Sequence, residues 1–160
     1  PVYYSMKTTG RPGTQEGFEK FKSKYLDVDN SPLYPFGYGL SYTEFEYGAT
    51  KISSEEMNMS GNITVSTTVT NTGDYDGEEV VQLYIHDKVR SITPPQKQLI
   101  GFQKISLKKG ESKTVEFTIS AEDLKFYNSS LEYVAEPGDF EVGIAPSSDF
   151  EFSSTFNLKK

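Results

Sequence analysis

The sequence contains no cysteine and a single histidine, His86. The absence of cysteine excludes disulfide bonds, thiolate metal sites and a cysteine nucleophile. One histidine excludes a metal site built from several imidazoles, and it leaves any Ser-His-Asp arrangement dependent on His86 alone. Asp87 is not expected to orient that ring, because adjacent residues of a strand face opposite sides. We therefore expect a partly exposed strand histidine rather than a catalytic one.

Long apolar runs and an excess of positive charge are also missing. No stretch approaches the roughly 20 apolar residues of a membrane-spanning helix, so we expect no membrane partner. The 23 Asp and Glu residues outnumber the 16 Lys and Arg residues, and the formal net charge of −7 argues against a nucleic-acid partner. Tryptophan is absent, yet 11 Tyr and 11 Phe bring the aromatic content to 14%. This composition favours a β-rich core.

Short segments with an apolar side chain at every second position follow one another beyond residue 44: residues 63–69, 81–85, 115–119 and 140–144. Turn residues separate them, which is the pattern of consecutive β-strands. Seven or more such strands indicate an all-β, antiparallel sandwich of the immunoglobulin or fibronectin type III class. We predict this sandwich over residues 44–160, preceded by an irregular linker arm over residues 1–43.

Two finer predictions concern connections within the sandwich. The segments 99–107 and 114–119 are joined by Lys108-Lys109-Gly110-Glu111, and this short turn predicts a β-hairpin. Leu124 and Tyr127 have the spacing of a corner at which a tyrosine hydroxyl bonds to the backbone and ties two sheets together. We expect Tyr127 to have this role.

The segment 32–43 combines the residues of a loop with the apolar content of a core. Its two prolines and two glycines exclude a regular helix or a central strand. Its side chains fit a buried crossover, a platform on which tyrosines stack on sugars, or an interface with a neighbouring domain. The residues alone favour the buried crossover. The family resemblance carried by the motif described next favours the interface instead, and from it we predict interdomain packing by seven residues: Tyr34, Phe36, Gly37, Tyr38, Gly39, Leu40 and Tyr42.

The run from Pro35 to Thr43, Pro-Phe-Gly-Tyr-Gly-Leu-Ser-Tyr-Thr, is the most distinctive motif of the chain. Three weaker motifs accompany it: Asn71-Thr72-Gly73, Gly77-Glu78-Glu79-Val80-Val81-Gln82-Leu83-Tyr84 and Glu136-Pro137-Gly138-Asp139-Phe140. Together they resemble the C-terminal fibronectin type III-like domain of family 3 glycoside hydrolases, the β-glucosidase and β-xylosidase family. The resemblance covers essentially the whole chain.

The resemblance implies a non-catalytic module that stabilises its parent protein by packing on upstream catalytic domains of the same chain. It implies that the parent is a retaining hydrolase of terminal β-linked glucose or related sugars, with an oligosaccharide substrate and neither a metal nor an organic cofactor. It places the catalytic carboxyl groups outside this chain and the parent in the periplasm or outside the cell. The alternative is a free-standing immunoglobulin-like module that binds carbohydrate or mediates adhesion.

The acidic residues of this chain occur mainly as adjacent pairs: Glu55-Glu56, Glu78-Glu79 and Glu122-Asp123. Retaining glycosidases need two carboxyl groups about 5 Å apart across the sugar, one of them held protonated. Adjacent side chains at strand ends diverge, and we expect solvent to keep both members of each pair ionised. No catalytic residue is therefore predicted. Residues 74–79 hold four carboxylates around Gly77, but their order is not that of a calcium loop, and we expect an exposed turn rather than a metal site.

Overall fold

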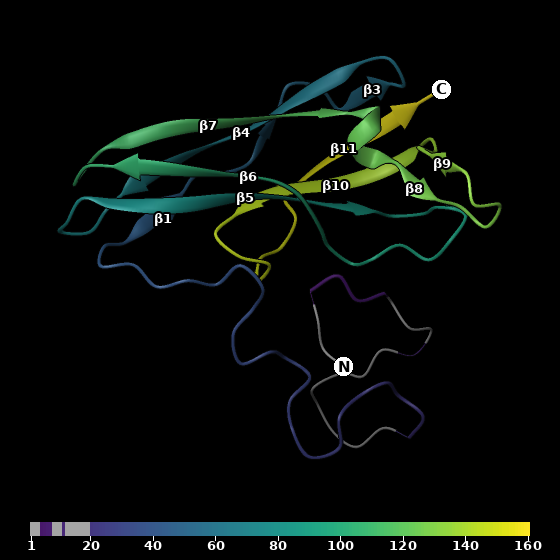
Figure 1. Cartoon of the computed structure of the whole chain (residues 1–160), viewed down its shortest axis with the longest axis horizontal. Coiled ribbons are helices and arrows are strands. Elements are labelled where there is room, and N and C mark those ends of the chain that lie inside the picture. Colours follow the sequence, from purple (N-terminus) through teal and green to yellow (C-terminus); the bar gives the residue numbers. More distant parts are fainter. Residues whose placement is uncertain (1–3, 8–10, 12–19) are drawn as a thin grey trace.

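The computed structural model describes residues 4–7, 11 and 20–160, and it shows two β-sheets stacked into a sandwich (Figure 1). The remaining residues of the predicted arm, 1–3, 8–10 and 12–19, lie outside the described part. The predicted all-β sandwich is confirmed. Within the described ranges, no helix has the length and apolar character needed to cross a membrane.

Four strands form one sheet and five form the other. The first contains β1 (Phe45–Tyr47), β2 (Lys51–Ile52), β4 (Asn62–Asn71) and β7 (Ser112–Ser120), with β4 paired to the other three. The second has the order β3 (Glu56–Asn58), β11 (Ser154–Lys159), β10 (Gly138–Ala145), β5 (Gly77–Asp87) and β6 (Gln98–Leu107). All pairs in these two sheets are antiparallel except β3 with β11.

The core lies between the two sheets and follows the alternation seen in the sequence. In β4, Ile63, Val65 and Val69 are fully buried on the inward side, where Thr67 is buried as well, while Thr64, Ser66 and Thr68 alternate with them on the outward side. Inward side chains of β7 in the same sheet and of β5, β10 and β11 in the facing sheet complete one continuous cluster, which includes Val81, Leu83, Val115, Ile119, Phe140, Val142, Phe156 and Leu158. Burial of this apolar surface is the main favourable term in folding the sandwich.

The predicted hairpin of β6 and β7 is wrong. β6 pairs with β5 and β7 pairs with β4, so the two strands belong to different sheets. The turn between them crosses from one sheet to the other, and its Gly110 N–H donates to the Asn71 carbonyl (3.0 Å) at the end of β4. Both strands are amphipathic because each contributes to the shared core from its own sheet. A short turn between two such strands is equally compatible with an arch across the core.

The predicted tyrosine corner is also wrong. A 3-10 helix, η1 (Ala121–Leu124), leads into a small separate hairpin of β8 (Phe126–Tyr127) and β9 (Tyr133–Val134). Phe126 is the buried residue of β8, whereas Tyr127 is exposed and its ring lies 4.9 Å from that of Tyr133. Since adjacent strand residues face opposite sides, burial of Phe126 directs Tyr127 to the surface.

Candidate functional site

The described part of the arm lies on the outward face of the five-stranded sheet, below β5 in Figure 1. Two backbone hydrogen bonds fix it there. The Ser148 N–H donates to the Phe36 carbonyl (2.8 Å), and the Gln96 N–H donates to the Met6 carbonyl (2.8 Å). The arm is thus tied both to the loop after β10 and to the crossover before β6.

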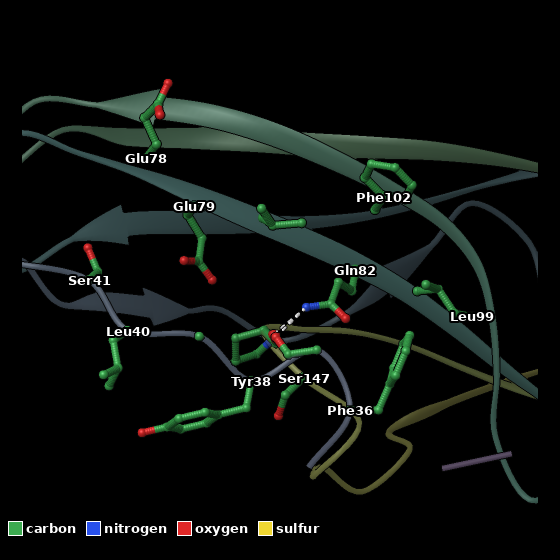
Figure 2. Close-up of a pocket in the computed structure, with 14 residues that line it drawn as sticks. Phe36, Tyr38, Leu40, Ser41, Glu78, Glu79, Gln82, Leu99, Phe102 and Ser147 are labelled. Carbon is green, nitrogen blue, oxygen red and sulfur yellow. Dashed lines mark hydrogen bonds between the residues drawn. The ribbon is translucent and has the colours of Figure 1, made fainter. Parts of the chain in front are cut away.

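Gln82 is the side chain that joins the arm to the sheet (Figure 2). It is buried on the outward face of β5, and its Nε2 donates to the carbonyls of Gly37 (3.1 Å) and Pro146. Its Oε1 accepts the hydroxyl of Tyr84 (2.6 Å). We call Gln82 with these three bonds the Gln82 clamp. It connects three separate segments of the chain through one side chain.

The backbone at Gly37 requires a glycine. Its φ of +82° lies in the left-handed region, and a Cβ there would be 2.1 Å from Oε1 of Gln82. Gly39 differs, because a Cβ at that position meets no atom within 4 Å. Of the two glycines in the predicted interface, only Gly37 is therefore required by the packing within this chain.

Aromatic rings extend the contact beneath the arm. Tyr4 stacks on Phe36 with ring centroids 4.0 Å apart, and its ring meets that of the fully buried Tyr84 edge-on at 6.2 Å. Burial, together with the nearby Tyr4, raises the pKa of Tyr84 to about 12, so its hydroxyl remains a donor for the Gln82 clamp. On its other side, Tyr84 contacts Phe150 at 5.4 Å.

Lys97 holds the loop after β10, and His86 holds the crossover before β6. The Lys97 ammonium donates to the carbonyls of Ser148 (2.7 Å) and Phe150 and lies 4.4 Å from the centre of the Phe150 ring. Burial lowers the pKa of Lys97. His86 is half-buried, as predicted, and its Nδ1 bonds to the Pro95 carbonyl (2.9 Å). These contacts give both side chains a structural role.

The predicted interface residues divide into an anchored part and an exposed part. Phe36 and Gly37 make the anchoring bonds described above, while the side chains that follow them project into solvent. Leu40 is 89% exposed and Tyr42 is 97% exposed. Tyr34 is more than half exposed, and Tyr38 is half exposed. The rings of Tyr34 and Tyr38 are tilted by 31° and do not form a flat platform.

A groove of about 680 Å³ separates these exposed arm residues from the sheet. Its arm side is formed by residues 36–41, and its sheet side includes Val80 of β5 with Leu99 and Phe102 of β6 (Figure 2). These three sheet residues were not predicted from the sequence. A signal for Val80 was present in β5, where Val80-Val81 and Leu83-Tyr84-Ile85 place apolar side chains at consecutive positions, as in strands covered on both faces.

Glu78 and Glu79 illustrate how the adjacent acidic pairs are used. Glu78 binds Lys104 (2.6 Å) on the outer surface, and this contact lowers the pKa of its carboxyl. Glu79 turns away and accepts the hydroxyl of Tyr47 (2.7 Å). The predicted divergence is confirmed, but the expected full solvation is wrong for Glu79, because burial raises the pKa of this carboxyl.

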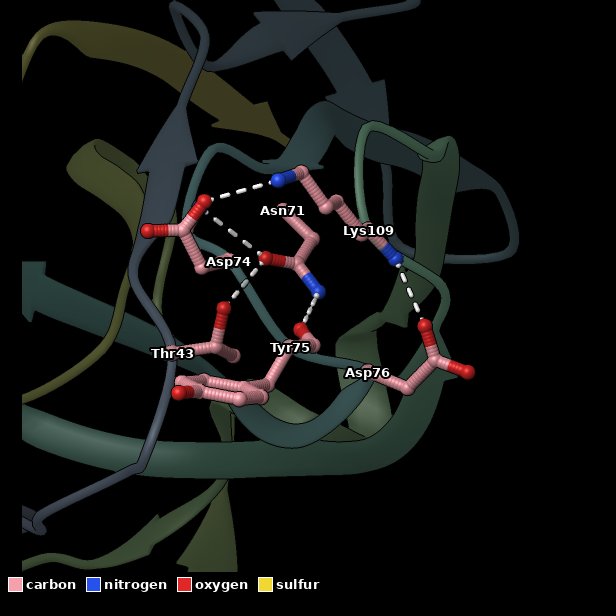
Figure 3. Close-up of polar contacts among 7 residues, drawn as sticks. Thr43, Asn71, Asp74, Tyr75, Asp76 and Lys109 are labelled. Carbon is pink, nitrogen blue, oxygen red and sulfur yellow. Dashed lines mark hydrogen bonds and ion pairs between the residues drawn. The ribbon is translucent and has the colours of Figure 1, made fainter.

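The acidic turn before β5 joins neighbouring connections of the sandwich (Figure 3). Asp74 binds the Lys109 ammonium (2.7 Å), and Asp76 accepts the Lys109 backbone N–H (2.8 Å). Beside them, the fully buried Asn71 accepts the hydroxyl of Thr43 (2.6 Å) and donates to the Tyr75 carbonyl (2.8 Å). In the residues that the structure describes, no three potential metal ligands come together.

Comparison with known families shows that residues 79–148 match the fibronectin type III-like domain. The periplasmic β-glucosidase of Salmonella typhimurium is 49% identical over 158 residues, covering 99% of this chain and 21% of that protein. A putative β-xylosidase of Formosa agariphila is 46% identical over 160 residues, covering 100% of this chain and 20% of that protein.

Solved structures give the same result in three dimensions. A crystal structure of a β-glucosidase from Listeria innocua in complex with glucose superposes with a TM-score of 0.90 and 41% sequence identity. The match covers 99% of this chain and 22% of that protein. This chain therefore spans about a fifth of the length of the proteins it resembles, and it aligns with their C-terminal part. It belongs to the fibronectin type III-like domains of glycoside hydrolase family 3 β-glucosidases and β-xylosidases.

Proposed function

We propose that this chain is a non-catalytic module that packs on the upstream catalytic domains of a longer parent protein and stabilises them. The observation that carries the proposal is the pattern of the matches: relatives about five times as long align with nearly the whole of this chain. On this proposal the parent is a β-glucosidase-type O-glycosyl hydrolase that removes terminal β-linked glucose or a related sugar by a retaining mechanism. The name of the Salmonella relative supports a periplasmic or secreted parent.

The carboxyl groups support a non-catalytic role for the chain itself. A retaining pair must face a common sugar from two sides. In contrast, Glu78 and Glu79 contact Lys104 and Tyr47, which lie on different strands. Glu122 binds Lys125, while its neighbour Asp123 caps η1 at Ser120.

The exposed arm residues support the proposed interface. Leu40 and Tyr42 lie almost wholly in solvent, and Tyr38, close to them in the sequence, is half exposed. Exposed apolar clusters are typical of surfaces that another protein surface covers. We propose that Tyr34, Phe36, Gly37, Tyr38, Gly39, Leu40 and Tyr42 form this interface, and that residue 43 ends the linker arm.

Two measurements test the proposal. Hydrolysis of an aryl β-glucoside is expected from the full-length parent and not from this chain alone, and measurable turnover by the purified chain would contradict the non-catalytic role.

Leu40→Ser should change the stability of the isolated chain by less than about 0.5 kcal/mol. In the parent it should lower the melting temperature, because removing a buried leucine costs about 2 kcal/mol or more. An unchanged melting temperature of the parent would contradict the interface.

A further inference from the structure

We propose that the outward face of β5 and β6 is the second half of the docking surface, and that the upstream part of the same parent chain occupies it. This inference rests on the proposed function and extends the interface from the arm to three sheet residues: Val80, Leu99 and Phe102. We call these three residues the sheet patch. They are far from the arm in the sequence, and the groove brings them opposite it.

The two outward faces of the sandwich differ sharply in chemistry. On the five-stranded sheet, Phe102 is 67% exposed and Val80 is 40% exposed. On the four-stranded sheet, the outward positions of β4 and β7 carry short polar or charged side chains: Thr64, Ser66, Thr68, Thr70, Thr114, Glu116 and Thr118. A solvated antiparallel sheet has the second pattern, so the first face is the one suited to burial.

The arm and the sheet patch form the two walls of one groove (Figure 2). Tyr38 and Leu40 line the arm wall, and Val80 and Phe102 line the sheet wall. The Gln82 clamp holds the walls at a fixed separation by binding the arm backbone at Gly37. Because the groove is formed before any partner arrives, its own residues lose little conformational freedom when an apolar side chain inserts there.

The charges around the groove restrict what the occupant presents. Glu78 is neutralised by Lys104 at the outer rim, and Glu79 lines the groove with a carboxyl whose described partner is the Tyr47 hydroxyl. A matching surface is therefore largely apolar and carries at most a hydrogen-bond donor opposite Glu79. An oligosaccharide, with hydroxyl groups over its whole surface, fits this lining less well.

The length of the relatives favours the upstream chain as the occupant. Relatives that align with this chain at their C-terminal part contain about four-fifths of their length outside the match. In such a protein the preceding domains are covalently joined to the arm, and the arm is itself one wall of the groove. Covalent linkage of this kind gives the preceding domains a high effective concentration beside the groove. Contact is then favoured even where the two surfaces would bind weakly as separate molecules.

Cysteine labelling tests the inference in the full-length parent, because this chain has no cysteine of its own. Three single variants are compared: Phe102→Cys in the sheet patch, Leu40→Cys in the arm and Thr118→Cys on the polar face as the matched control. All three positions are exposed, so the variants are expected to fold. Maleimide labelling is followed by peptide-resolved mass spectrometry in the isolated chain and in the parent, with Val80→Cys as a second probe of the sheet patch.

All of these sites should label readily in the isolated chain. In the parent, labelling at positions 102, 80 and 40 should slow by at least about tenfold, as for other groups that must be uncovered by an opening motion, while position 118 is unaffected. Protection of position 40 with full reactivity at 102 and 80 would overturn this inference and leave the proposed function intact. Full reactivity at all three would overturn both. If labelling of the isolated chain slows as its concentration rises, a second copy of the chain covers this face, and the proposed occupant is refuted.

Discussion

Replacement of Gln82 by alanine is the most informative test of how the arm is held. The substitution removes all three bonds of the Gln82 clamp. It leaves the hydroxyl of Tyr84 without its partner in a fully buried position, which costs about 1–3 kcal/mol. The carbonyls of Gly37 and Pro146 adjoin the open groove, where water can replace the lost donor, so each adds about 0.5–1.5 kcal/mol.

We therefore expect Gln82→Ala to lower the free energy of unfolding by about 3 kcal/mol, a large part of the stability of an ordinary domain. Urea unfolding of the isolated chain measures this loss. Hydrogen exchange reports the arm separately, because the Ser148 amide donates to the Phe36 carbonyl and should exchange faster once the clamp is gone. Gln103→Ala, on the neighbouring strand but exposed, is the matched control.

A second substitution separates the cost of the unpaired Tyr84 hydroxyl from the cost of the lost bonds to the Gly37 and Pro146 carbonyls. In Gln82→Ala combined with Tyr84→Phe, the unpaired hydroxyl is absent, so about 1 kcal/mol or more of the lost stability should return. If Gln82→Ala costs no more than the Gln103→Ala control, about 0.5 kcal/mol, the clamp does not anchor the arm. The fixed separation of the two groove walls would then have to be abandoned as well.

Three other predictions follow from single contacts. Gly37→Ala should destabilise the chain by about 1–2 kcal/mol from its left-handed backbone alone, whereas Gly39→Ala should be nearly neutral, as measured by urea midpoints. Asn71→Asp keeps the shape of the side chain but replaces the donor to the Tyr75 carbonyl with a carboxylate, so a loss of about 3 kcal/mol is expected in thermal or urea unfolding. Burial raises the pKa of Glu79 above its ordinary 4.5, so the folded chain binds this proton at a pH where the unfolded chain has released it. The contribution of Glu79 to stability thus falls as the pH rises through that interval. Glu79→Gln should therefore gain stability relative to the wild type as the pH rises above about 4.5, a trend that a series of unfolding measurements would reveal or exclude.

Local patterns predicted the strands well, because burial in a sandwich follows directly from alternation. β4 is an example, with Ile63, Val65, Thr67 and Val69 inside and Thr64, Ser66 and Thr68 outside. Pairing was harder to predict. β6 and β7 have the same amphipathic pattern whether they lie side by side or in opposite sheets, and only the long-range partners β5 and β4 decide between these arrangements.

The candidate site was predicted in part for a similar physical reason. The unusual composition of residues 32–43 is a local property, so the arm could be selected from the sequence. The sheet patch depends on two strands whose register places Gln82 opposite Phe102. That register, and the Gln82 clamp that brings Gly37 onto the same face, arise only when distant segments fold together.

The proposed role of this chain is that of a packing module and not of a sugar-binding one. Isothermal titration distinguishes the two roles, with the chain titrated against the remaining part of its parent and, separately, against cello-, xylo- and laminari-oligosaccharides. We expect a binding heat with the parent fragment that Leu40→Ser reduces, and no heat with the sugars. Binding to any of the oligosaccharides without binding to the parent fragment would refute the packing role and assign the exposed aromatic residues to carbohydrate recognition.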